Sequence, residues 1–113
     1  MKPGDERKSD AGMTEILREV VRRIVRVANP ERIILFGSSA RGDENVDSDI
    51  DILVVKECVQ RREVAGRIYQ ALIGVGRAVD VVVATPADIE RYRHSPSMVI
   101  APALGDGRVI YAA

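Results

Sequence analysis

Three aspartates in this chain have the residue type and the spacing to bind a divalent cation. Asp49 and Asp51 stand two residues apart at the start of an apolar segment, and Asp80 lies within another one, VDVVVA. Residues two apart on a strand project from the same face, so the two carboxylates would share one face while Ile50 faces the core. Carboxylates that crowd together repel unless a cation lies between them, and oxygen ligands of this kind suit Mg²⁺.

Asp80 can join this pair if its strand lies beside theirs, because facing side chains on neighbouring strands are about 5 Å apart. Three carboxylates around two cations roughly 4 Å apart activate an attacking hydroxyl and stabilise a departing pyrophosphate in phosphoryl transfer. We therefore expect Asp49 and Asp51 to hold two Mg²⁺ ions. Asp80 would hold the metal at the attacking oxygen and is a candidate to accept the hydroxyl proton.

A phosphate-binding turn is predicted directly after the first apolar run, IILF. Gly37 and Ser38 follow that run, and a glycine there lets the backbone turn tightly and direct its N–H groups at a phosphate. The Ser38 hydroxyl adds a donor, so both residues are candidates to bind the β- and γ-phosphates of a nucleotide. Two roles fit Arg41: a bidentate contact to a phosphate, or an ion pair with Asp43 or Glu44 of the same loop.

Helices on either side of these segments would position the candidate residues. Thr14 is placed to cap the first helix and Asn29 and Pro30 to end it, and Thr85 and Pro86 suit a helix start. Apolar residues at helical spacing, with these start and stop signals, predict helices over residues 14–28, 64–73 and 86–93. Residues 98–104 could add a short helix, broken by a proline.

Short apolar runs predict strands at residues 33–36, 49–55, 79–84 and 109–111. Because strands and helices alternate, we expect one sheet with helices packed on it. Residues 1–12 combine Pro, Gly, Ser and charges, which is typical of a disordered terminus. The remaining residues 13–113 fit a single domain.

Charge and cysteine content restrict the partners and the compartment. The 17 basic and 17 acidic residues give a formal net charge of zero, so nucleic acid is a poor candidate partner. Only the arginines of residues 18–26 could form a positive patch, and an arginine-flanked helix is more often a solvated face. Cys58 is the only cysteine, which fits a reducing cytoplasm, and we expect a buried or half-buried position for it. No secretory signal and no membrane-spanning run is recognisable.

Taken together, these motifs resemble those of the polymerase-β-type nucleotidyltransferase superfamily. The segments GSSARGD at residues 37–43, SDIDILV at residues 48–54 and VDVVV at residues 79–83 carry the similarity. They are most similar to the minimal nucleotidyltransferases (MNT) of HEPN–MNT toxin–antitoxin pairs, and the similarity extends over residues 14–112. It implies an α/β (α+β) fold of the polymerase-β-like type, with a short mixed β-sheet flanked by helices.

The resemblance also implies Mg²⁺ and ATP as ligands and transfer of AMP to a hydroxyl. In this branch the acceptor is a tyrosine of a HEPN toxin, which we expect the adjacent gene to encode. The similarity assigns Gly37 and Ser38 to the triphosphate site and Asp49, Asp51 and Asp80 to the metal and catalytic site. The chain would then be an antitoxin that forms a hetero-oligomer with its partner or a homo-oligomer.

The length of the chain leaves no room for a further domain that would recognise a template, an RNA or a drug. We therefore expect an acceptor site that is shallow or that a partner completes. Two alternatives stay open. One is a non-catalytic antitoxin that masks its partner, and the other, less favoured, is a nucleotidyltransferase that acts on a small molecule such as an aminoglycoside.

Overall fold

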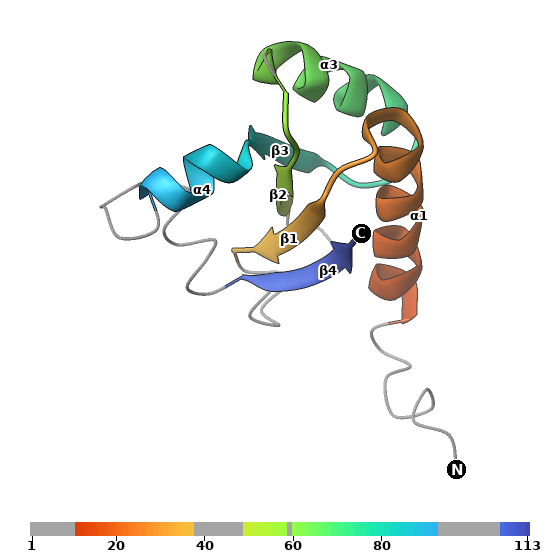
Figure 1. The fold of residues 1–113 in the computed structure, drawn as a ribbon. Coiled ribbons are helices and arrows are strands. Elements are labelled where there is room, and N and C mark those ends of the chain that lie inside the picture. The colour runs from red at the N-terminus through yellow and green to blue at the C-terminus, as the bar shows by residue number, and fades with distance from the viewer. Residues whose placement is uncertain (1–10, 38–48, 59, 93–106) are drawn as a thin grey trace.

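Helical and extended segments alternate along the chain and form one sheet with helices packed on it (Figure 1). The computed structural model describes residues 11–37, 49–58, 60–92 and 107–113. Within these residues the elements are α1 (Ala11–Ala28), β1 (Arg32–Phe36), β2 (Ile50–Val55), α3 (Arg61–Ala71), β3 (Val79–Ala84), α4 (Pro86–Tyr92) and β4 (Arg108–Ala112).

The four strands form a mixed sheet in the order β3-β2-β1-β4. α3 carries the chain from β2 to β3, and this crossover makes these two strands parallel. β1 is antiparallel to both β2 and β4. The predicted fold class, a short mixed sheet flanked by helices, is confirmed.

Successive side chains of the strands point to opposite faces of the sheet and form two apolar cores, one on each face. The larger core joins α1 and α3 to the first face through Val20, Ile24, Ile33, Leu35, Ile50, Ile52, Val54 and Ile68, all fully buried. The smaller core joins α4 to the other face through Ile34, Leu53, Val55, Ala84 and Ile89. β2 is buried on both faces, which explains why its sequence is an almost continuous apolar run.

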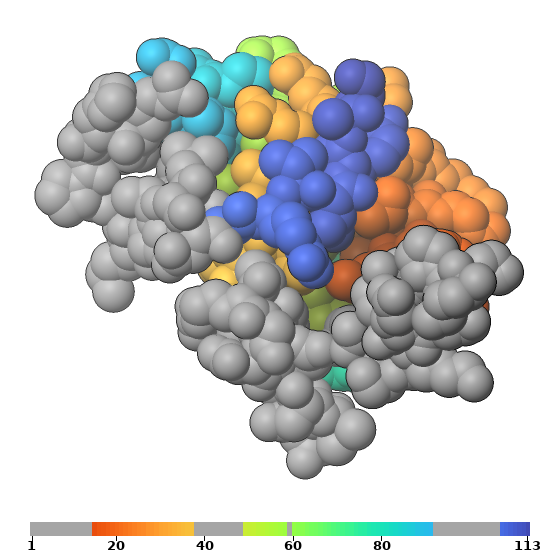
Figure 2. All heavy atoms as spheres, turned by 90° about the horizontal axis from the view of Figure 1, so that it is seen from below, coloured from red at the N-terminus to blue at the C-terminus, as the bar shows by residue number. Residues whose placement is uncertain are grey.

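The two outer strands differ in what covers them. The Tyr69 hydroxyl of α3 accepts a hydrogen bond of 2.8 Å from the backbone N–H of Val81 in β3. This contact occupies a backbone donor on the open edge of β3, where another strand could otherwise pair. At the other edge, β4 and α1 lie side by side (Figure 2).

α1 ends at the predicted residue, Ala28, but it begins before the predicted start at Thr14. Asn29 ends the helix in the left-handed region, with φ of 49°, and its N–H donates to the Val25 carbonyl at 3.0 Å. α1 begins at Ala11, so the predicted cap at Thr14 is wrong and Ala11 and Gly12 belong to the helix rather than to the terminus. The high helix propensity of Ala11 and Met13 favours this extension, whereas that of Gly12 opposes it.

The other predicted elements are confirmed with small shifts of their ends. β3 has the predicted bounds, and α3 begins three residues earlier than its apolar stripe. Gly74 and Gly76, which follow that helix, have φ of 87° and 99°. Cys58 is half-buried and packs against the larger core, as expected. The helix considered for residues 98–104 lies outside the described residues. Among the described helices, none has the length and apolar character that crossing a bilayer requires.

A reciprocal pair of hydrogen bonds begins α4, at the predicted helix start. Thr85 Oγ1 accepts from the Asp88 N–H at 3.0 Å, and Asp88 Oδ2 accepts from the Thr85 N–H at 3.0 Å. This arrangement is a capping box with aspartate in the third helical position. The bond from the Thr85 backbone, and then the Arg61 guanidinium nearby, lower the pKa of Asp88.

We expect Thr85→Ala to lower the free energy of unfolding by about 1 kcal/mol, because the Asp88 N–H loses its acceptor. Thr85→Ser, which keeps the hydroxyl, is the control and should retain most of the stability. Because the pKa of Asp88 is lower in the folded state, its stabilising effect is present above the unfolded-state pKa and is lost as the pH falls. Urea unfolding over an acidic pH series measures both effects, and equal stability of the alanine and serine variants would contradict the capping role.

Candidate active site

Asp51 and Asp80 lie beside each other at one end of the sheet. Each is the second residue of its strand, and the two are register partners in the parallel pair of β2 and β3. Register partners on neighbouring strands project from the same face, so the two carboxylates face the same space. The predicted neighbourhood of the two strands is thus confirmed.

Successive side chains of β2 point to opposite faces of the sheet, and this determines which face the carboxylates share. Ile50 and Ile52 are fully buried in the larger core, so Asp51 between them projects from the opposite face, the one that α4 covers in part. Asp49 is exposed and stands one residue before β2. Asp80 is exposed although its neighbours in β3 are buried, which makes it the more accessible of the two strand carboxylates.

Gly37 brings the end of β1 against the Asp51 carboxylate. Its φ of 79° lies in the left-handed region, as the predicted tight turn requires. A Cβ atom at this position would stand 2.6 Å from Asp51 Oδ2. The site therefore needs glycine here both for the backbone conformation and for the space beside the carboxylate. Ser38 and Arg41, the other predicted phosphate-binding residues, lie outside the described residues, and their roles stay predictions.

Burial and like charge act together on Asp51. Loss of hydration raises the pKa of this half-buried carboxyl above its ordinary range, and the negative charges of Asp80 and then Asp49 raise it further. Negative side chains held together in this way oppose each other's ionisation. A bound cation would remove this cost, which is the electrostatic property expected of a metal site.

The donor set fits a cation that needs few ligands from the protein. Among the residues that the structure describes, no group of three or more His, Cys, Asp or Glu side chains is placed to hold a metal ion. Mg²⁺ does not require such a cage, because one or two carboxylates usually bind it together with waters and substrate phosphates. Asp51 and Asp80 can supply two carboxylates. Asp49 as a third ligand, and the second metal ion, stay predictions.

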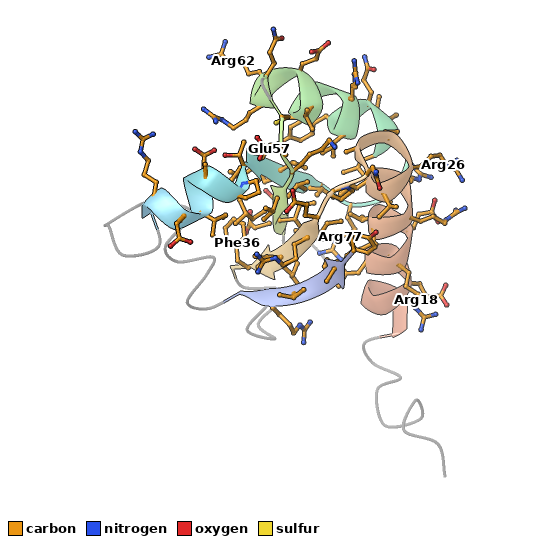
Figure 3. The ribbon with its side chains drawn as sticks, viewed as in Figure 1. Arg18, Arg26, Phe36, Glu57, Arg62 and Arg77 are labelled. Carbon is orange, nitrogen blue, oxygen red and sulfur yellow. The ribbon has the colours of Figure 1, made fainter. Side chains whose placement is uncertain are left out.

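Phe36 borders the site and was not among the predicted site residues. It is the last residue of β1 (Figure 3). Because Phe36 is the register partner of Asp51, its ring lies on the same face as that carboxylate. The half-buried ring packs against the smaller core, and an apolar neighbour of this kind contributes to the loss of hydration at the carboxylate. The signal in the sequence was an aromatic residue that closes an apolar run directly before Gly37.

Comparison with known proteins identifies the family to which the chain belongs. A model of the nucleotidyltransferase domain family matches residues 14–103. A crystal structure of a protein from Sulfolobus solfataricus ascribed to the nucleotidyltransferases has a TM-score of 0.64 and 23% identity, over 93% of this chain and 85% of that chain. A search of curated protein sequences found no match.

Two further structures with this fold are toxin–antitoxin complexes. One, a complex with AMP-PNP, has a TM-score of 0.53 and 25% identity, over 83% of this chain and 72% of that chain. The other, a substituted MntA–HpeT complex, has a TM-score of 0.52 and 22% identity, over 82% of this chain and 71% of that chain. The resemblance drawn from the three motifs is therefore confirmed. With the family match extending over most of its length, the chain belongs to the nucleotidyltransferase domain family.

Proposed function

We propose that this protein is a Mg²⁺-dependent nucleotidyltransferase that transfers AMP from ATP to a hydroxyl of a partner protein. The observation that carries the proposal is the in-register pair of Asp51 and Asp80, with the Gly37 turn against Asp51. The similarity to a toxin–antitoxin complex with AMP-PNP supports the nucleotide and the kind of partner. On this basis the protein is a cytoplasmic antitoxin. Its acceptor is a tyrosine of a HEPN-type toxin that the neighbouring gene encodes.

The proposed reaction is a single displacement at the α-phosphorus of ATP. The acceptor oxygen forms a bond to that phosphorus, the bond to the bridging oxygen of the β-phosphate breaks, and pyrophosphate leaves. When bound, Mg²⁺ neutralises the charge on the phosphates. Asp49, Asp51 and Asp80 would hold the cations, and Asp80 would also accept the hydroxyl proton. Gly37 and Ser38 would bind the triphosphate through the turn.

The position of Asp80 supports a macromolecular acceptor. This carboxylate is exposed and lies on β3, an outer strand of the sheet. A side chain that projects from the surface of another protein can therefore approach it. A small acceptor would instead need a pocket that surrounds it and holds it in place.

Label transfer tests the proposal. The protein, α-labelled ATP and Mg²⁺ are mixed with the purified product of the neighbouring gene, and wild type is compared with Asp80→Asn and with Glu57→Gln. Glu57 is an exposed carboxylate beyond the far end of β2 and serves as the matched control (Figure 3). We expect labelling by wild type and by Glu57→Gln, and loss of at least about 99% of it in Asp80→Asn, since a proton acceptor contributes 10²-fold or more.

Each other outcome points to a different function. Labelling by Asp80→Asn at the rate of wild type would exclude Asp80 from catalysis. A stable complex that wild type never labels would favour an antitoxin that acts by binding alone. Labelling of an added aminoglycoside, with none of the protein, would favour the small-molecule alternative.

A further inference from the structure

We propose that the groove between α1 and β4 binds an acidic amphipathic helix of the partner protein. The groove would hold the partner while a different part of it enters the active site. This inference rests on the proposed function, because it takes the docked protein to be the acceptor. It adds a docking surface that is built from residues outside the carboxylate site.

The groove has an apolar floor and a basic rim. It encloses about 420 Å³ where α1 and β4 lie side by side (Figure 2). Its lining consists of Leu17, Val21 and Ile110, with the arginines Arg18, Arg22 and Arg108. The three apolar side chains are half-buried and pack against the larger core, so the floor is fixed by the fold. Apolar side chains of a bound segment would find a preformed surface here.

Two of the three arginines on the rim have no ion-pair partner among the described residues. Arg22 pairs with Glu19 at 2.5 Å on the same helix, whereas Arg18 and Arg108 form no ion pair with any described residue. Arg18 projects from the exposed side of α1 (Figure 3). Arg18, Arg22 and Arg108 thus bring three positive charges together on the rim of this groove. The complementary ligand carries apolar side chains between carboxylates, and the apolar floor favours a protein segment over a polyphosphate backbone.

The irregular outer strand favours a helix as the bound segment. β4 holds one extra residue opposite β1, because Ile33 pairs with Tyr111 and Ile34 with Val109. A bulge of this kind interrupts the regular ladder and makes the edge a poor template for an added strand. Recognition must then come from side chains. A helix that places apolar residues in the groove at three- and four-residue spacing meets that requirement.

The groove and the carboxylates share one end of the sheet but occupy opposite faces. Arg108 is the register partner of Leu35, next to the Phe36 and Asp51 pair. The apolar floor belongs to the face that α1 covers, and Asp51 projects from the face of α4. A partner bound at the groove can therefore extend past this end of the sheet and place its acceptor at the carboxylate site. Docking and transfer use different side chains and can be separated by mutation.

Calorimetric titration of the purified product of the neighbouring gene tests the docking surface. We expect Arg108→Glu and Arg18→Glu each to weaken the affinity at least about tenfold, and the wild-type affinity to fall with added salt. Arg62→Glu is the matched control, because Arg62 is exposed on α3 and forms no ion pair with described residues (Figure 3). It should bind like wild type. Asp51→Asn should also keep its affinity for the partner while it loses transfer.

Several results would overturn the docking surface. Equal affinity of Arg108→Glu and wild type would exclude the groove, yet leave the label-transfer test of Asp80 unaffected. Dimerisation of wild type that Arg108→Glu abolishes would assign the groove to a second copy of the chain. Binding of a fluorescent single-stranded RNA that the same variant abolishes would assign it to nucleic acid. Absence of any complex with wild type would reject both the groove and the proposed partner. Circular dichroism verifies that each variant is folded.

Discussion

Asp51→Asn is expected to abolish nucleotide transfer and, without Mg²⁺, to make the protein harder to unfold. A carboxylate that holds the catalytic cation contributes several kcal/mol to the transition state, so transfer should fall at least about 1,000-fold. The amide keeps the size of the side chain but removes the charge that binds the cation. Label transfer measures the loss, with Glu57→Gln as the control, and transfer within tenfold of wild type would reject the assignment of Asp51.

The gain in stability follows from the raised pKa of Asp51. Burial, and then the charges of Asp80 and Asp49, raise this pKa in the folded state. The folded state therefore holds the proton more tightly than the unfolded chain. The stability from this proton is fully present below the unfolded-state pKa and is lost as the pH rises through the folded-state pKa. At neutral pH the ionised carboxylate is thus a cost that the asparagine avoids.

Thermal unfolding with and without Mg²⁺ separates these effects. At neutral pH without Mg²⁺, we expect Asp51→Asn to have the higher Tm, and the difference should disappear in acid, where the wild-type carboxyl is protonated. Added Mg²⁺ should raise the Tm of wild type and leave that of the variant unchanged, because only a folded-state ligand shifts the equilibrium. A lower Tm for the variant at neutral pH without Mg²⁺ would show that the carboxylate is stabilised by contacts other than those described.

Gly37→Ala should reduce transfer about 100-fold. The added Cβ would stand 2.6 Å from Asp51 Oδ2, so the carboxylate must move. A displacement of about 1 Å in a catalytic group can cost 10²-fold in rate. Alanine also adopts the left-handed region at a cost of about 1 to 2 kcal/mol, which lowers the stability.

Gly74→Ala separates the two effects of this substitution. Gly74 has a similar φ of 87°, but a Cβ there would meet no atom within 4 Å. The two alanine variants should lose similar amounts of stability in urea unfolding, and only Gly37→Ala should lose transfer. If Gly74→Ala reduced transfer equally, the effect at Gly37 would reflect backbone strain and not the contact with Asp51.

The strands that carry the site could be predicted because their signals are local. The apolar runs around Asp51 and Asp80 identify β2 and β3, and the helix between them favours a parallel pair, which places these residues in register. Gly37 could be predicted for the same reason, since a positive φ after an apolar run is a property of the residue itself. Local chemistry also located the start of α4 at Thr85.

The features that could not be predicted from the sequence depend mostly on contacts between segments that are far apart in it. Phe36 lies beside Asp51 because of the register in which β1 pairs with β2. The residues around Phe36 in the sequence do not determine this register. The groove requires α1 to meet β4, and this depends on the pairing of β4 with β1, two strands far apart in the sequence. The predicted start of α1 was wrong because Thr14 has the residue type of an N-cap, whereas the helix continues through it to Ala11.

The position of the two carboxylates in the sheet gives them different mechanical support. Asp51 belongs to β2, an inner strand with a neighbouring strand on each side and apolar layers on both faces. Asp80 belongs to an outer strand, where local opening exposes fewer contacts and requires less free energy than opening the centre. Of the two proposed ligands, Asp51 is therefore held by a strand that is buried on both faces, whereas Asp80 can adjust. Such a site can keep its charge in place while accommodating the changing geometry of a reacting phosphate.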